Sequence, residues 1–181
     1  MRHRRVETRS TIPWPAWARF VLKQRAMDFE WLFRAACGYA ELGMTRESVS
    51  ELNAIDKKFQ NRPEVLQLRL HHLMRKRCWA RALVISRKLC RLAPRYTTGF
   101  LHAGFCLNAL GKTAQAKELL LKGPSALLSE PIYYYNMGCY DALLGNVRDA
   151  QMHLQTSFKM DKSFRELAKK DPDLKAVQPF L

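Results

Sequence analysis

The side chains of this 181-residue chain that could bind a metal or act as nucleophiles are scattered. His102 and Cys106 are four positions apart, so on a helix they would share one face and could supply two metal ligands. No second pair of this kind is evident, so we predict no metal site. Five cysteines, an odd number without a secretory signal, predict reduced thiols and a cytoplasmic protein. The other histidines and cysteines are His3, His71, His72, His153, Cys37, Cys78, Cys90 and Cys139.

The sequence also lacks the motifs that identify common classes of enzyme. The sequence has no phosphate-binding loop, no dinucleotide fingerprint and no nucleophile elbow. No apolar run approaches the roughly 18–20 residues that a membrane-spanning helix needs. The composition, 48% hydrophobic and 26% charged, excludes a disordered chain. We therefore expect a folded, non-enzymatic protein with no cofactor and no membrane insertion.

The net charge of +15 is concentrated in two stretches. Residues 1–28 carry seven Lys and Arg against two acids, and residues 63–96 carry nine against one. A plain basic tail is preferred for residues 1–13, with an organelle transit peptide as the weaker interpretation. The patch in residues 63–96 suits an acidic protein, a nucleic acid or a phosphorylated surface, or is a solvated face without a partner. The predicted basic patch is Arg75, Lys76, Arg77, Arg81, Arg87, Lys88 and Arg91.

A repeat of 34 residues organises the rest of the chain. Gly43, Gly111 and Gly145 each follow a segment with helical apolar spacing, and they are 68 and 34 positions apart. Arg77 occupies the missing place in this series. Units would then begin at 29, 63, 97 and 131 and form antiparallel helix pairs, whose apolar faces are buried only when neighbouring pairs stack. Small residues where the helices cross recur at the eighth and twentieth places: Ala36, Gly104 and Gly138, and Ser48, Ala82, Ala116 and Ala150.

This pattern resembles the tetratricopeptide repeat, a 34-residue helix-turn-helix unit. The best matches are F-L-H-A-G-F-C-L from Phe100 with Ala116, and Y-Y-N-M-G-C-Y-D from Tyr134 with Ala150. The resemblance covers residues 29–164. It implies an all-α, right-handed superhelical array, and the terminal stretch resembles bacterial members of the family. The expected parts are a tail (1–13), an N-terminal helix (14–28), repeats at 29–62, 63–96, 97–130 and 131–164, and a C-terminal capping helix (165–181).

Three departures from the family pattern are noted. Arg69 occupies a normally apolar place, so either the second unit is shifted or the side chain extends its charge to water. Gly123-Pro124 should shorten the second helix of the third unit and leave a short helical connection after it. Asp141 replaces the usual aromatic residue or Leu.

The resemblance implies that the first helix of each unit lines a concave groove. We expect a peptide with apolar and acidic anchors to bind there, which makes the chain a scaffold or chaperone-like adaptor. Alternatively, the aromatic and apolar members only complete the packing between helices. The rival function is nucleic-acid association through the basic patch. The predicted groove residues are Phe33, Arg34, Cys37, Gln67, His71, Met74, Arg75, Leu101, His102, Phe105, Asn108, Tyr135, Asn136 and Cys139.

Overall fold

A computed structural model of the protein describes the backbone of residues 16–178 and the side chains of residues 28–178. The predicted basic tail lies outside the described residues. Within residues 16–178 the regular secondary structure is helical and contains no strand, which confirms the all-α class. The chain divides into two compact units, Met1–Gln60 and Asn61–Leu181, and each is described by itself.

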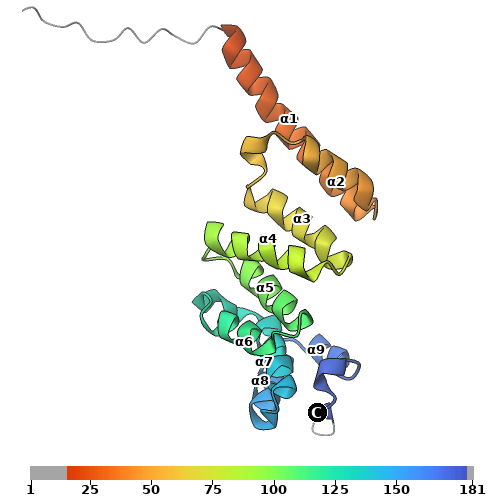
Figure 1. Ribbon diagram of the computed structural model, residues 1–181, viewed down its shortest axis with the longest axis vertical. Coiled ribbons are helices and arrows are strands. Elements are labelled where there is room, and N and C mark those ends of the chain that lie inside the picture. The colour runs from red at the N-terminus through yellow and green to blue at the C-terminus, as the bar shows by residue number, and fades with distance from the viewer. Residues whose placement is uncertain (1–15, 179–181) are drawn as a thin grey trace, which may run out of the picture. The chain divides into compact units, whose positions relative to one another are not determined.

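The first unit consists of α1 (Ala16–Glu41), α2 (Thr45–Ala54) and the short 3-10 helix η1 (Lys57–Phe59) (Figure 1). The sequence predicts a helix boundary between residues 28 and 29, but α1 runs through it without a break. The physical reason is that residues 16–37 contain neither Gly nor Pro, so nothing ends the helix. The helices α1 and α2 cross at Ala36 and Ser48, two of the small residues that the repeat places at helix crossings. There the Ser48 hydroxyl donates a hydrogen bond of 2.7 Å to the buried Ala36 carbonyl.

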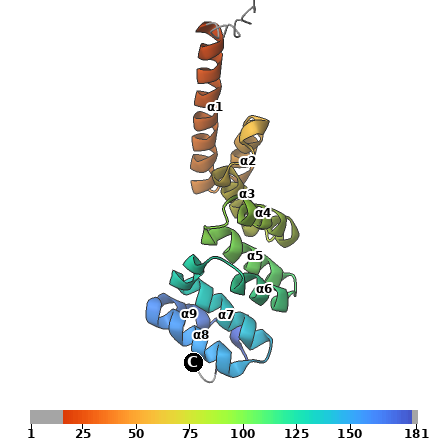
Figure 2. The ribbon, with the colours of Figure 1, turned by 90° about the vertical axis from the view of Figure 1, so that its left-hand side faces the viewer.

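The second unit is a succession of helices in which each packs against the next (Figures 1 and 2). Its order is α3 (Pro63–Arg75), α4 (Trp79–Leu92), α5 (Thr97–Ala109), α6 (Thr113–Leu121), η2 (Ser125–Ser129), α7 (Pro131–Leu143), α8 (Val147–Met160), α9 (Ser163–Ala168) and η3 (Pro172–Leu174). The helix α6 is short and is followed by a short helical connection, as Gly123-Pro124 predicts. The turn between α3 and α4 lies where the 34-residue repeat predicts it, so the second unit is not shifted. Arg69 is instead a half-buried side chain of α3.

The four helix turns show the 34-residue period in the backbone itself. In each, an amide donates to the carbonyl five residues earlier, at 2.8–2.9 Å, from positions 44, 78, 112 and 146. This bond belongs to the C-terminal cap that places one residue in the left-handed region. That residue is Gly43, Gly111 or Gly145 in three turns and Arg77, with φ 53°, in the fourth. The exact limits of the repeats stay a prediction.

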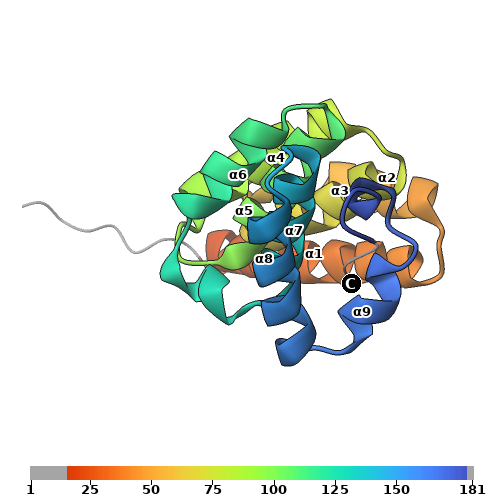
Figure 3. The same ribbon diagram turned by 90° about the horizontal axis from the view of Figure 1, so that it is seen from below.

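The second unit ends in a segment that returns to α7. The helix α9 contacts α8, and η3 contacts α7. Figure 3 shows α9 joined to the end of α8 by a short loop. The Asp171 carboxylate accepts a hydrogen bond from the Asp173 amide at 3.0 Å and so caps η3, whose first residue is Pro172. Leu174 and Val177 are fully buried. These contacts fix the position of the segment that borders the candidate site.

Candidate functional site

A hollow of about 420 Å³ lies in the second unit among α3, α5, α7 and α9. The first three are the helices expected to line the groove, which places groove residues of three repeats around one space. Three of the residues that line the hollow were missed: Ile132, Leu167 and Asp171. The predicted groove residues in its lining are Met74, Leu101, His102, Phe105, Tyr135 and Asn136.

The hollow is mostly apolar and partly open. Phe105 is 44% exposed and Leu167 is 50% exposed, so both can meet a ligand. The Phe105 ring is held by the Trp79 ring, edge to face, with 5.5 Å between centroids. On the same wall, Nδ1 of His102 lies 2.8 Å from the Thr98 carbonyl, which can only accept. Since that nitrogen must donate, Nε2 remains the free acceptor of the neutral ring.

The far end of the predicted groove is closed by the chain itself. The Tyr135 hydroxyl donates to Asp171 Oδ2 at 2.7 Å, and the Asn108 amide donates to Asp173 Oδ2 at 2.9 Å. Cys139 is 5% exposed, with Sγ 3.8 Å from the Asp171 carboxylate. Burial, and then the charges of Asp171 and Asp173, raise the pKa of the Cys139 thiol well above its ordinary value. Asn108, Tyr135 and Cys139 therefore make contacts within the chain, and Tyr135 also lines the hollow.

The remaining predicted groove residues lie outside this hollow. Gln67, His71 and Arg75 are exposed on α3. In the first unit, Arg34 is exposed, the Phe33 ring stacks on Phe29, and Cys37 is half-buried. Burial raises the pKa of the Cys37 thiol, and the nearby Glu41 charge raises it further.

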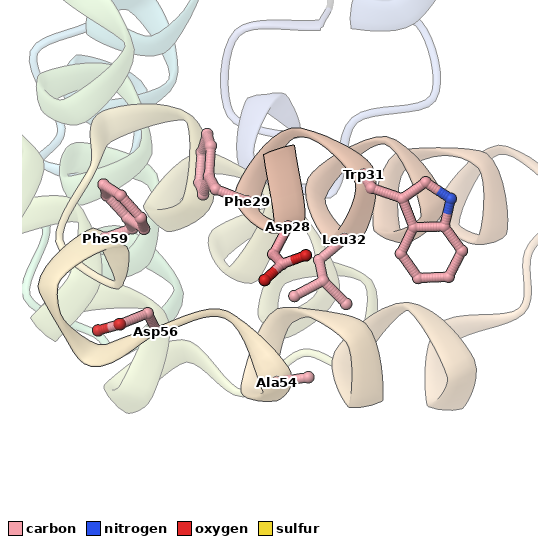
Figure 4. Close-up of a pocket in the computed structure, with 7 residues that line it drawn as sticks. All are labelled: Asp28, Phe29, Trp31, Leu32, Ala54, Asp56 and Phe59. Carbon is pink, nitrogen blue, oxygen red and sulfur yellow. The ribbon is translucent and has the colours of Figure 1, made fainter. Parts of the chain in front are cut away.

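A separate hollow of about 490 Å³ lies in the first unit, between α1 and the segment that follows α2 (Figure 4). The Asp28 carboxylate points into it, while the rings of Phe59 and Trp31 lie at opposite ends. Because these two rings are separated, they do not form an aromatic cage for a cation. None of Phe33, Arg34 and Cys37 lines this hollow.

The basic patch is displayed on the end of α3, the following turn and one face of α4. All of its members are exposed except Lys88, which is half-buried and donates to the Asn61 side chain at 2.5 Å. None of the seven has an ion pair with any described residue. The α4 face also exposes Val84 (67%) and Leu92 (50%), whereas its opposite face is buried.

No three His, Cys, Asp or Glu side chains within residues 28–178 are placed to hold a metal ion. Burial raises the pKa of both Cys90 and Cys106 to about 11, so these thiols stay protonated near neutral pH and are poor nucleophiles. In the part of the chain that the structure covers, no helix has the length and apolar character needed to cross a membrane.

The comparison with solved structures bears on the fold. No protein-family model and no curated protein sequence matches the chain. A solved structure described as "MamA RS-1 ArsTM double mutant" is similar, with a TM-score of 0.66 and 17% sequence identity over 81% of this chain and 80% of that one. MamA contains tetratricopeptide repeats, so this likeness supports a fold of that type. At this identity the comparison shows the fold alone.

Proposed function

We propose that the protein is a non-enzymatic interaction module that binds a peptide segment in the hollow among α3, α5, α7 and α9. The observation that carries this proposal is the lining. Groove residues from three helices surround one mostly apolar space with two half-exposed anchoring side chains, Phe105 and Leu167. Such a site takes an apolar side chain of a partner, because desolvated apolar pockets supply most of the binding free energy at interfaces.

The acidic anchor of the proposed ligand is assigned to the α3 side. His71, Met74 and Arg75 share one face of α3, because they are three and four residues apart. Met74 lines the hollow, so a carboxylate next to an anchored apolar side chain would meet Arg75 and His71. The segment that follows α9 shows that such a combination of side chains can bind to these helices. Its carboxylates are bound by side chains of α5 and α7, and its aliphatic side chains are buried.

A selection from a random peptide library tests the proposal. We expect the full chain to enrich peptides with an apolar anchor, and Phe105→Ala and Leu101→Ala to weaken their binding at least tenfold, about 1.4 kcal/mol. The matched control is Met152→Ala, because Met152 is a comparably exposed apolar residue (53%) on α8, away from the hollow. Selected peptides that bind Phe105→Ala and Met152→Ala equally well would place the binding site elsewhere.

A second candidate is nucleic-acid association through α4. It is favoured by the exposed cations of the patch, which lack ion pairs with described residues. We expect a 20-base-pair duplex to bind weakly and to be released by salt, with a log–log slope of about −4 if four or five phosphates are contacted. Replacing Arg81, Arg87, Lys88 and Arg91 by Gln should abolish this binding. If the unchanged chain fails to bind the duplex at low salt, this candidate fails.

A further inference from the structure

We propose that Asp171 gives the hollow a negative end, so that its ligand carries a cation or hydrogen-bond donor on one side of its apolar anchor and a carboxylate on the other. This inference rests on the proposed function and specifies the chemistry of the ligand. It departs from the sequence-based expectation, which assigned only apolar and acidic anchors. The difference arises because the sequence did not predict that residues after α9 would border the site.

The carboxylate of Asp171 is fixed in place. One oxygen accepts from the Asp173 amide at 3.0 Å, and the other accepts from the Tyr135 hydroxyl at 2.7 Å. Each oxygen therefore has its own donor, one from η3 and one from α7, and the two bonds orient the carboxylate at this end of the hollow. Asp171 is also the only acidic side chain in the described lining of the hollow. A ligand carboxylate at this end would therefore be repelled, and a ligand cation would be attracted.

The positive side comes from a different helix. Met74 contacts α5, with its sulfur 3.5 Å from Cys106 Sγ, and the next residue, Arg75, is exposed without an ion pair to any described residue. Asp171 instead contacts α7 through Tyr135. The cation of Arg75 thus lies beside the α3 side of the hollow, next to Met74, while the carboxylate of Asp171 belongs to the lining at the α7–α9 side. A segment with acidic, apolar and basic residues in succession matches this arrangement.

Three labelled peptides test the inference by fluorescence anisotropy with the full chain at 0.15 M salt. Each has a central Leu-Phe, flanked by Glu on one side and Lys on the other, by Glu on both sides, or by Lys on both sides. The mixed peptide should bind tightest. In Asp171→Asn, Oδ1 can still accept from the Asp173 amide, and Nδ2 can donate to the Tyr135 oxygen, which then becomes the acceptor. This variant removes the charge and should weaken the mixed peptide about fivefold and strengthen the all-Glu peptide by a similar factor.

Asp173→Asn is the matched control. It removes the same charge two residues away, but the Asp173 carboxylate is bound by Asn108 and does not line the hollow. It should leave the order of the three peptides unchanged. The inference is overturned if the all-Glu peptide binds the unchanged chain as tightly as the mixed one, or if the two variants have equal effects. If none of the peptides binds better than versions with Ser in place of Leu-Phe, the proposed function fails as well.

Discussion

At the scale of single residues, Arg77 holds a backbone conformation that glycine holds in three sister turns. Its φ of 53° compares with 75°, 73° and 82° at Gly43, Gly111 and Gly145. A non-glycine residue in this region is strained by about 1–2 kcal/mol, part of which is offset by the flexibility that glycine gives the unfolded chain. We therefore expect Arg77→Gly to raise the free energy of unfolding by about 0.5–1 kcal/mol in urea denaturation.

The adjacent Lys76 provides the control for this change. Its φ is −83°, which any residue adopts, so Lys76→Gly should lower the free energy of unfolding. Both substitutions remove one positive charge from the same turn, which separates the backbone effect from electrostatics. A loss of stability in Arg77→Gly equal to that in Lys76→Gly would contradict the strain argument.

Asp141 is a second residue whose contribution to the free energy of unfolding can be measured. It is fully buried, with Lys117 Nζ at 2.5 Å, His153 Nδ1 at 3.1 Å and Asn146 Nδ2 at 3.1 Å. Asp141→Ala should lower the free energy of unfolding by about 2 kcal/mol, less than a fully buried pair would cost, because Lys117 and His153 still reach water. Glu118→Ala, which removes an exposed ion pair with Lys122, should change stability little. Equal losses in the two variants would contradict the role of burial.

At the scale of elements, the distance between two crossing helices decides how large a side chain can be at the crossing. A Cβ on Gly138 would lie 2.6 Å from Leu154 Cγ and 3.3 Å from the Ala150 carbonyl, where α7 crosses α8. Gly138→Ala should therefore lower the free energy of unfolding by about 1–3 kcal/mol. Gly38→Ala meets nothing within 4 Å and should stabilise α1 by about 1 kcal/mol, because alanine is the better helix former. Thermal unfolding of both variants checks the contrast, and a stabilising Gly138→Ala would refute it.

The sequence predicted the elements that depend on local chemistry. The capping glycines, the place of Arg77 in their series and the shortened α6 all follow from which residues can adopt a turn. Part of the lining of the candidate site was anticipated, because the places that the family resemblance assigns to the groove include Met74, Leu101 and Phe105. The return of Asp171 to Tyr135 was not predicted, since a contact between residues 36 positions apart leaves no periodic signal. The continuity of α1 was missed because a repeat boundary was assumed where no helix-breaking residue occurs.

At the scale of the whole molecule, the uneven positive charge acts on stability through His72. Burial lowers the pKa of His72 below its ordinary 6.5, and the positive potential of His71, Lys76, Arg75 and Arg69 lowers it further. The unfolded chain then takes up a proton near pH 6.5 that the folded chain refuses, so stability should fall as the pH is lowered from 7.5 to 5.5.

Urea midpoints across this range measure the effect of His72. His72→Gln should remove most of the slope, and added salt should reduce it in the unchanged chain by screening the neighbouring cations. Carboxylates titrate mainly below this range, so they contribute little to it. A slope that is the same in His72→Gln would assign the pH dependence to another group.

The hollow is walled by Met74 at one side and by Leu167 and Asp171 at the other, about a hundred positions further along the chain. Contacts between successive helices do not complete this wall. The turns after α8 must also pack against α7 before Leu167 and Asp171 can line the hollow. Short terminal turns fray more readily than internal helices. An occupied hollow should hold them down and shield the exposed Lys169 and Lys170 from trypsin, so the rate of cleavage there reports how much of the protein carries its partner.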